Sequence, residues 1–500
     1  VSSETWFVDA PGGVEVLTGR TVNGDFDDFG RARTTTYLDG SSVTRVYGCC
    51  GVASETDRDG IATSYAYDAF GRVSHTERDG IATLHTYDEL GNRTSTTVLG
   101  RDGGEITTSM SYDNGEPASS TDALGNVTLH ARSHAASGDD VVCTETTTYP
   151  DGSTLVSTAV NGEPVSEGGT AVHGRTMTVG AGWRTTTTPV DGNVAMTVTA
   201  RSDMLGRVFR TEYADGTFSM TFYNAAGQAV KTVSPAGRAT LFAYDALGRQ
   251  VAKAVDMDGS GEIDGADLVD STSYGYGVQG GKTVSVTTRT RSQGASSAVV
   301  SVLKRSVDGL ESWRTDRHGL TTHERLERLG DGVTRRTVSR PDGTKAVTTS
   351  VNGRTATVQM INADNTDGNL STYSYDEFNR LAGVVETFGS TTVGSVSMAY
   401  DAAGNVLSLT VNGQTTLFRY DAMGRRTRVT APGGVVTSTA YHPTGEVRRV
   451  DGASHPVEYT YNALGLKATM TTFKDAATPQ TTSWDYDARG FLAAKTYADG

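Results

Sequence analysis

The 500-residue sequence lacks long hydrophobic runs, excess basic charge and pairable cysteines. No apolar stretch approaches the ~20 residues that a helix needs to cross a bilayer, so no transmembrane segment is predicted. The formal net charge is -14, and this acidic balance argues against a protein that binds nucleic acid. Proline is scarce, with 11 residues against 59 glycines, which favours short strands and tight turns over long helices.

The cysteines are Cys49, Cys50 and Cys143. An odd number cannot all pair within one chain, and no Cys-x-x-Cys spacing indicates a metal site. Adjacent cysteines such as Cys49 and Cys50 seldom bond to each other. We therefore expect small buried or semi-buried thiols, and the sequence leaves their redox state open.

The ends of the chain show neither a start nor a stop signal. Val1 is preceded by no Met and followed by no secretory signal peptide. Gly500 falls in an Asp-Gly turn, where another strand is expected. We expect residues 1–500 to be a fragment of a longer protein, with any export signal or effector segment outside it.

One hexapeptide recurs along the chain. YDALGR stands at 244–249, and its variants are YDAFGR at 67–72, YDELGN at 87–92, YDEFNR at 375–380, YDAAGN at 400–405 and YDAMGR at 420–425. Tyr67 and Tyr87 are 20 residues apart, as are Asp59 and Asp79. Each unit contains an Asp-Gly hairpin signal and an Asp-x-x-Gly turn, whose Asp can accept hydrogen bonds from the backbone ahead. Two strands of about 6–7 residues and two turns account for the period.

Aromatic residues show which face of each strand is buried. Large side chains stand two residues before the turn tyrosine, as at Tyr65, Phe242, Phe418 and Trp484. Positions i and i+2 share one face of a strand, so these pairs predict an aromatic ladder on one side of a sheet. The predicted fold is all-β, with repetitive antiparallel β-hairpins in a long curved or spiralling sheet.

The repeats vary in clarity but form one continuous array over 1–500. Clear repeats cover 20–110, degenerate repeats cover 111–200, and repeats with an inserted loop at 256–267 cover 201–280. Residues 281–360 are degenerate again, and 370–500 are clear. No Pro/Ser linker or charge run divides domains.

The consensus aromatic-x-Tyr-Asp-x-x-Gly-Arg/Asn resembles the YD repeat of the Rhs family. That family includes bacterial polymorphic toxins, the C component of insecticidal Tc toxins and the extracellular shell of teneurins. The resemblance implies a hollow β-shell, which in the toxin members encloses a C-terminal effector released by paired aspartates in an Asp-Pro-rich block. None of the 11 prolines here follows an Asp, so neither protease residues nor effector activity is expected in this window.

Two hypotheses for function follow from the repeat. The favoured one is a structural scaffold of a large secreted or surface-delivered protein, whose partners would be its own C-terminal effector segment or a secretion apparatus. The alternative is a cell-surface adhesion or carbohydrate-binding module, in which exposed tyrosines contact glycans. Both hypotheses predict a secreted or cell-surface location and no nucleic-acid partner.

The inserted loop has the spacing of a calcium-binding loop. Residues 256–267 read DMDGSGEIDGAD, with Gly261 at position 6 and Ile263 at position 8 of an EF-hand pattern. Asp at position 12 resembles the dockerin-type loop. The flanking segments read as strands, so we expect a structural Ca²⁺ loop within a hairpin, unless it is merely a solvated acidic turn. Its predicted ligands are Asp256, Asp258, Ser260, Glu262 (by its backbone carbonyl), Asp264 and Asp267.

Enzyme motifs are weak. GYGVQG at 275–280 matches a dinucleotide-binding pattern but precedes a strand-like segment, so it offers no helix N-terminus for a pyrophosphate. HERLE at 323–327 lacks the second histidine of a zinc protease. No set of nucleophile, base and orienting group emerges, and we predict that the chain is not an enzyme.

Overall fold

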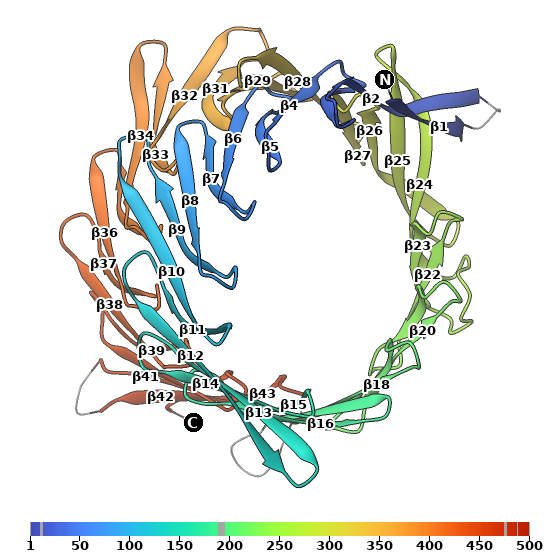
Figure 1. Cartoon of the computed structure of the whole chain (residues 1–500). Coiled ribbons are helices and arrows are strands. Elements are labelled where there is room, and N and C mark those ends of the chain that lie inside the picture. Colours follow the sequence, from blue (N-terminus) through green and yellow to red (C-terminus); the bar gives the residue numbers. More distant parts are fainter. Residues whose placement is uncertain (1, 11–13, 189–195, 475–477, 488, 500) are drawn as a thin grey trace. The chain divides into compact units, whose positions relative to one another are not determined.

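The computed structural model describes residues 2–10, 14–188, 196–474, 478–487 and 489–499. These residues form 43 strands and no helix (Figure 1), which confirms the predicted all-β class. Among them there is consequently no helix long and apolar enough to span a membrane.

The strands up to residue 233 are β1 (Ser2–Ala10), β2 (Val14–Phe26), β3 (Ala32–Tyr37), β4 (Ser42–Tyr47), β5 (Val52–Thr56), β6 (Ala62–Tyr67), β7 (Val73–Arg78), β8 (Ile81–Tyr87), β9 (Arg93–Leu99), β10 (Glu105–Asp113), β11 (Glu116–Thr121), β12 (Val127–Ser137), β13 (Asp140–Thr148), β14 (Thr154–Val160), β15 (Glu163–Gly168), β16 (Arg175–Gly180), β17 (Trp183–Thr188), β18 (Met196–Ser202), β19 (Val208–Tyr213), β20 (Phe218–Tyr223) and β21 (Ala229–Val233).

The later strands are β22 (Ala239–Tyr244), β23 (Gln250–Val255), β24 (Leu268–Gln279), β25 (Lys282–Gln293), β26 (Ser296–Ser306), β27 (Glu311–Asp316), β28 (Thr321–Gly330), β29 (Val333–Ser339), β30 (Lys345–Val351), β31 (Arg354–Ile361), β32 (Asp367–Tyr375), β33 (Leu381–Phe388), β34 (Thr391–Tyr400), β35 (Val406–Val411), β36 (Gln414–Tyr420), β37 (Arg426–Thr430), β38 (Val436–Tyr441), β39 (Val447–Asp451), β40 (Val457–Tyr461), β41 (Lys467–Thr472), β42 (Gln480–Tyr486) and β43 (Leu492–Thr496).

Hairpins are the building unit of the sheet. The pairings described between consecutive strands are antiparallel, as in β5–β6, β6–β7 and β7–β8. Strands β6 and β8 have 6 and 7 residues, so the predicted hairpin repeat is confirmed here. A register shift beside the turn tyrosine recurs, for example between Ala66 and Tyr67 and between Arg419 and Tyr420.

The aspartate of each Tyr-Asp turn organises the turn around its carboxylate. Asp68 Oδ1 accepts the backbone N–H groups of Phe70 at 2.9 Å and Arg72 at 3.0 Å. Asp68 Oδ2 accepts Arg72 Nε–H at 2.6 Å. Gly71 has a φ of 77°, a left-handed conformation that suits glycine. The predicted forward hydrogen bonding by Asp is therefore confirmed. Where Asn replaces Arg, as at Asn405, its Nδ2 donates to the same carboxylate at 2.9 Å.

The turn tyrosine links its turn to the preceding repeat. Tyr67 Oη donates a hydrogen bond to the carbonyl of Val52 at 3.0 Å, and Tyr420 Oη donates to the carbonyl of Val406 at 2.9 Å. Six other tyrosines donate to a backbone carbonyl in an earlier strand: Tyr47, Tyr112, Tyr223, Tyr375, Tyr441 and Tyr486. The tyrosine is therefore both a packed ring and a polar cross-link between repeats.

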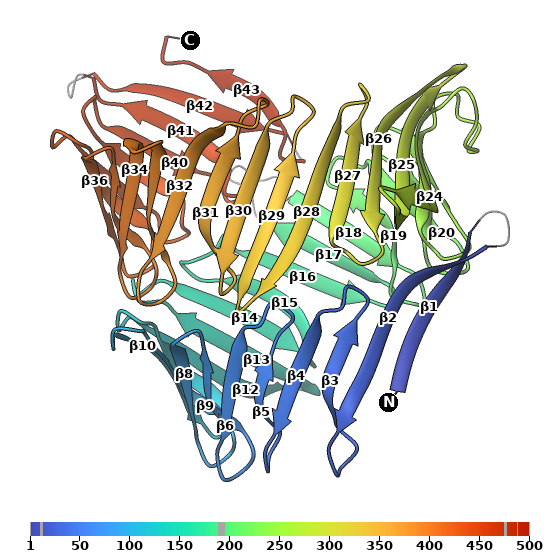
Figure 2. The same ribbon diagram turned by 90° about the horizontal axis from the view of Figure 1, so that it is seen from above.

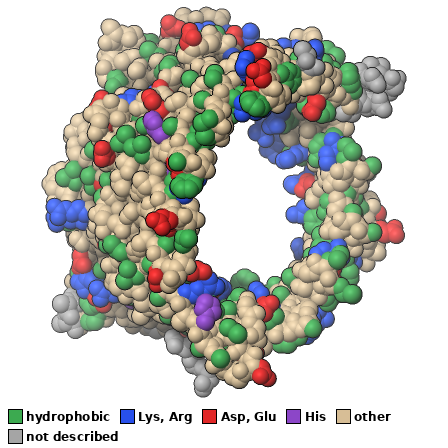
Figure 3. Space-filling view, viewed as in Figure 1, with side chains coloured by type: hydrophobic (Ala, Val, Ile, Leu, Met, Phe, Trp, Pro, Cys, Tyr) green, Lys and Arg blue, Asp and Glu red, His purple; other side chains and the backbone are tan. Residues whose placement is uncertain are grey.

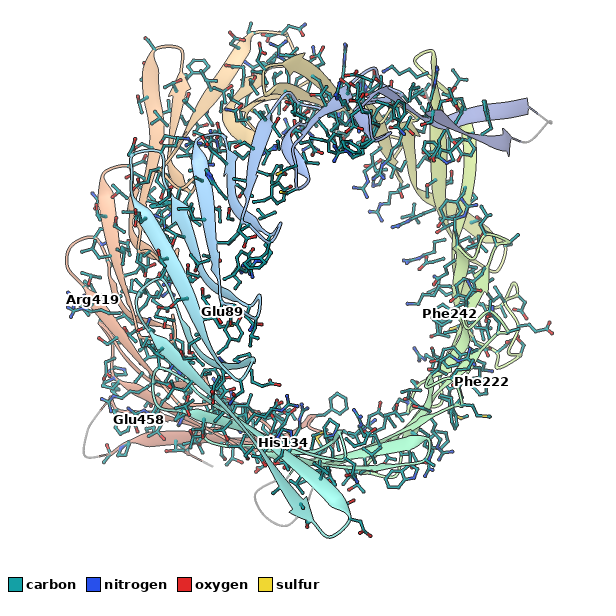
Figure 4. The ribbon with its side chains drawn as sticks, in the orientation of Figure 1. Glu89, His134, Phe222, Phe242, Arg419 and Glu458 are labelled. Carbon is teal, nitrogen blue, oxygen red and sulfur yellow. The ribbon has the colours of Figure 1, made fainter. Side chains whose placement is uncertain are left out.

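Side chains leave both faces of the strands (Figure 4). In β6, Tyr65 and Tyr67 are half-buried and the intervening Ala66 is exposed. The alternation confirms the predicted aromatic face. Fully buried hydrophobic residues are nevertheless few in the described residues, and hydrophobic side chains reach the surface at many places (Figure 3). Ladders of neighbouring side chains, more than a central core, therefore cover the apolar area.

The chain divides into two compact units. The first comprises residues 1–86, 95–107 and 241–397, and the second comprises 87–94, 108–240 and 398–500. Each unit thus contains an early part and a late part of the sequence. In the first unit we call residues 1–86 and 95–107 the first row and residues 241–397 the second row. In the second unit the first row is 87–94 and 108–240, and the second row is 398–500.

In the first unit, hairpin turns join the two rows (Figure 2). Asn352 Nδ2 donates to Asp79 Oδ1 at 2.5 Å, and the backbone N–H of Gly104 donates to Glu377 Oε2 at 2.8 Å. Both pairs are separated by 273 residues in the sequence. These two pairs thus share one register, whereas Arg328 reaches Asp39 and Asp59 across 289 and 269 residues.

The second unit repeats this arrangement. Arg425 Nη2 donates to Asp151 Oδ2 at 3.0 Å, across 274 residues. His173 Nε2 lies 2.6 Å from Glu446 Oε1, across 273 residues. The separation at these two pairs nearly equals that of the two pairs in the first unit, and side chains of turns and loops make the contacts.

Asp39 is the most enclosed carboxylate of these contacts. Its side chain is 1% exposed, and its Oδ2 accepts Arg58 Nη2 at 2.6 Å and Arg328 Nε at 3.3 Å. Burial raises the pKa of Asp39, but hydrogen bonds from the Ser41 hydroxyl and backbone, and then the Arg58 guanidinium, outweigh burial and lower that pKa to about 2. The carboxylate is thus stabilised in its charged form.

We expect Tyr420→Phe to destabilise the protein by about 1 kcal/mol, because it removes one half-buried hydrogen bond while keeping the ring. Urea denaturation measures the difference. The matched control is Tyr497→Phe, since Tyr497 is 56% exposed. Equal stability of parent and Tyr420→Phe would show that the hydroxyl contributes nothing to the repeat.

The Asp39 contact predicts a pH dependence. A folded-state pKa below the unfolded value stabilises the protein at higher pH, and the gain is lost as pH falls from about 4 to about 2. Asp39→Asn should cost on the order of 2 kcal/mol at neutral pH. That cost should shrink across the acidic range in urea denaturation at stepped pH. The exposed Asp113→Asn is the matched control, and a cost for Asp39→Asn that stays constant with pH would contradict the assignment.

Candidate calcium site

The inserted loop 256–267 joins two strands of one hairpin. Strands β23 and β24 pair antiparallel, and Val255 faces Leu268 at the base of the loop. Both lie among the green strands at the right of Figure 1. The flanking strands were predicted, and the structure confirms that no helix adjoins this loop. The loop is therefore held at both ends by a sheet of the first unit.

Three carboxylates of the loop gather at one point. Ligand oxygens of Asp256, Asp258 and Asp267 all lie within 4.8 Å of one another. Asp258 is exposed, Asp256 is half-buried and Asp267 is 0% exposed. Three converging carboxylates repel one another unless a cation or protons compensate their charge. Hard divalent cations such as Ca²⁺ prefer this all-oxygen environment.

Of the three carboxylates, that of Asp267 is the least exposed to solvent, so water stabilises its charge least. Its Oδ1 accepts the backbone N–H of Met257 at 2.9 Å, and its Oδ2 accepts that of Asp264 at 3.3 Å. No Lys, Arg or His side chain forms an ion pair with Asp267 among the residues that the structure describes. A buried carboxylate with only neutral donors is costly, and a bound cation would lower this cost.

The other predicted ligands do not all join the three carboxylates. Ser260 Oγ donates to the Glu262 carbonyl at 3.1 Å and to Asp264 Oδ2 at 3.4 Å. The Glu262 side chain is exposed, and only its carbonyl was predicted to bind metal. Gly261 has a φ of 77°, as the sharp turn at position 6 requires. A backbone hydrogen bond from Ser260 is the main cause that lowers the pKa of Asp258.

The residue at position 8 of the loop pattern anchors the loop to the sheet. Ile263 packs against the buried cluster of Leu241, Ala254 and Val269. This confirms the anchoring role that its position in the pattern indicates. A further anchor was not predicted: the backbone N–H of Gly294 donates to the Gly265 carbonyl at 2.8 Å. Gly294 belongs to the turn between β25 and β26, and nothing in the local sequence pattern signals this contact.

The prediction for the cysteines is partly wrong. Cys49 and Cys50 are exposed, whereas Cys143 is semi-buried as expected. Cys49 and Cys50 occupy the tip of the turn between β4 and β5, where Gly48 stands in place of the usual Asp. Their sulfur atoms are 2.6 Å apart.

The rejected enzyme motifs lie in strands. Residues 275–280 form the end of β24 and the following turn to β25, and residues 323–327 lie within β28. His323 stacks on Trp313 with ring centroids 4.8 Å apart, and its Nε2 lies 2.9 Å from Glu311 Oε2. Neither segment supplies the helix that its motif would need.

Comparison with protein families supports the identification of the repeat. Residues 52–82, 223–260 and 400–436 match the family model described as RHS Repeat. These matches confirm the resemblance of the chain to RHS repeats in clear parts of the array. No curated protein matches the chain.

Solved structures with similarity to the chain include Tc toxin complexes. One is a holotoxin pore of Photorhabdus luminescens with a mutated TccC3 component, at 12% identity and a TM-score of 0.41. It is matched over 99% of this chain and 36% of that chain. Another is a TcdB2–TccC3 crystal structure, at 14% identity and a TM-score of 0.33, over 99% and 34%. The chain therefore spans about a third of the length of these structures.

Proposed function

We propose that this chain, with RHS repeats in three of its segments, is the structural scaffold of a large secreted or surface-delivered protein. The observation that carries the proposal is the repeated Tyr-Asp turn, whose carboxylate and guanidinium hold the turn itself and whose phenol binds the preceding hairpin. These groups, which could otherwise serve binding or catalysis, are used in holding the strands together. A scaffold needs no enzymatic residues, and this role accounts for the repetition.

The partner of such a scaffold would be its own C-terminal effector segment, delivered by a secretion apparatus. The toxin members of the RHS family suggest this arrangement, in which the repeats form part of a hollow shell. The alternative, adhesion to glycans through tyrosines, is less favoured. The turn tyrosines are half-buried, and many of their hydroxyls donate to backbone carbonyls.

The test is intact-mass and native-gel analysis of the full-length parent, with all sequence beyond Gly500 restored. A C-terminal fragment that is cleaved yet remains bound until denaturation is expected. A single uncleaved chain that binds glycans would overturn the effector-scaffold proposal and favour an adhesin.

We further propose that loop 256–267 binds one structural Ca²⁺. Asp256, Asp258 and Asp267 would supply carboxylate oxygens, with Ser260, the Glu262 carbonyl and Asp264 completing the shell. The ion would neutralise the buried Asp267 and fix the hairpin β23–β24. Binding to the folded state alone raises stability by about 2.7 kcal/mol at a calcium concentration of about 100 times Kd.

Calcium should raise the melting temperature of the parent, and Asp256→Ala with Asp258→Ala should abolish the rise. Calorimetric titration should likewise show one Ca²⁺ per parent chain and none for the double variant. Glu262→Gln is the matched control, because it removes an acidic side chain of the same loop but keeps the carbonyl. Melting that is identical with and without Ca²⁺ in the parent would exclude the site.

A further inference from the structure

One part of the chain has the opposite charge to the chain as a whole. Residues 282–339 contain 11 Lys and Arg against 6 Asp and Glu, whereas the net charge of the whole chain is -14. This segment comprises β25 to β29 and the turns between them, all in the second row of the first unit. A basic segment in an acidic protein favours contact with an anionic partner.

Strand register places several of these basic residues on one face of the sheet. Residues that lie opposite each other in an antiparallel pair share a face, and so do residues two apart along a strand. Ser301, Leu303 and Arg305 therefore share one face of β26. Ser301 lies opposite Arg289 of β25, and Leu303 lies opposite Arg314 of β27. We call the face that carries Arg289, Arg305 and Arg314 the basic face.

A cavity of about 450 Å³ lies on the basic face. Its lining residues are Leu303, Arg305, Ser312, Arg314, Thr322 and Glu324. All six lie within β26, β27 and β28 rather than in turns. The lining thus combines two guanidiniums, two hydroxyls and one carboxylate with an apolar leucine. Such a mixture can hold both the charged end and the apolar stem of an acidic side chain.

The two arginines of the cavity have no carboxylate partner. Arg305 and Arg314 are exposed, and neither guanidinium forms an ion pair or a hydrogen bond among the residues that the structure describes. Glu324 is already engaged, because its Oε1 accepts Arg336 Nε at 2.6 Å. This hydrogen bond, and then the charges of Arg336 and Arg305, lower the pKa of Glu324. The cavity therefore keeps an excess of basic charge.

The opposite face of the same strands is the packed one. Trp313 is 8% exposed and Val284 is 0% exposed, and both lie on that face. The basic face contributes little to this packing. Arg305 and Arg314 are diagonal neighbours on adjacent strands, and two like charges at that spacing repel each other. The stability of the sheet therefore does not account for these two arginines.

We propose that the basic face binds an extended acidic segment of a polypeptide, with one carboxylate in the cavity between Arg305 and Arg314. A guanidinium is a planar fork that matches both oxygens of a carboxylate. The same sheet already contains such a pair, since Arg291 Nε and Nη2 donate to the two oxygens of Asp270 at 2.6 and 2.8 Å. The cavity offers the same group without its partner.

The position of Arg289 favours a polypeptide over a single small anion. Its side chain is exposed, and it has no ion pair among the described residues. It lies two strands away from Arg314 on the basic face. Two carboxylates of one extended segment can reach both arginines, whereas one small anion fills one position. A nucleic acid is less suited, because the net charge of -14 repels a dense polyanion.

This inference goes beyond the scaffold role, which stands whether or not the basic face is occupied. Fluorescence anisotropy of the 500-residue protein with a labelled short peptide of alternating Glu and Ser tests it. The parent should bind this peptide but not the same peptide with Gln for Glu, and salt should weaken binding. Arg305→Gln with Arg314→Gln should weaken binding by about tenfold or more, because charged hydrogen bonds are lost.

The matched control is Arg325→Gln with Arg335→Gln. Both arginines are exposed and lie on the opposite face of β28 and β29, so the same charge is removed away from the cavity. This control should bind the acidic peptide as the parent does. In urea denaturation, Arg305→Gln with Arg314→Gln should be at least as stable as the parent, because the removed guanidiniums have no carboxylate partner.

Three results would overturn the proposal. The first is a parent that does not bind the acidic peptide. The second is an equal loss of affinity in the two double variants, which would mean that overall charge alone attracts the peptide. The third is tighter binding of a single-stranded oligonucleotide or of citrate than of the peptide, which would assign the basic face to another class of anion.

Discussion

The structure depends on one carboxylate that accepts backbone N–H groups in each Tyr-Asp turn. Asp421 shows the full set of contacts: its Oδ1 binds the N–H groups of Met423 and Arg425, and its Oδ2 orients the Arg425 guanidinium. The oriented guanidinium then lies over the ring of Tyr441, 5.2 Å from its centroid, and reaches Asp151. The Asp421 carboxylate thus closes its own hairpin. Through the Arg425 guanidinium it also supports the contact between repeats and the contact between rows.

Such shared groups stabilise a sheet that has no second layer packed on it. Few side chains are fully buried, so the usual hydrophobic contribution per residue is modest. Hydrogen bonds and ion pairs of half-exposed groups are individually weak, but the repeat multiplies them. The loop 256–267 fits the same pattern, since the proposed ion would compensate the buried charge of Asp267, which has no basic ion-pair partner among the described residues.

Much of the local structure could be predicted from the sequence because it is encoded locally. The period of 20 residues, the role of Asp68, the half-buried Tyr65 and the strands that flank loop 256–267 follow from turn chemistry and alternation. The hydroxyl contact of Tyr67 with Val52 was not predicted, because it depends on how far apart neighbouring hairpins lie.

The contacts between rows could not be predicted from the sequence. A separation of 273 residues depends on how many strands and turns lie between the two partners, which no single repeat specifies. The exposure of Cys49 and Cys50 was missed for a related reason. Their burial was judged from residue type, whereas both residues lie at the tip of one turn and are exposed there. In the loop 256–267, the gathering of three carboxylates agrees with the spacing, and the contact from Gly294 does not follow from it.

The central claim is that the turn carboxylate holds both its own hairpin and the neighbouring row. The most direct measurement is amide hydrogen exchange in the parent and in Asp421→Ala. Exchange should accelerate at Met423 and Arg425, which lose their acceptor, and also at Ser153, whose partner Asp151 loses the guanidinium of Arg425. Acceleration confined to the turn 421–425, with Ser153 unchanged, would contradict the claim that one carboxylate serves both.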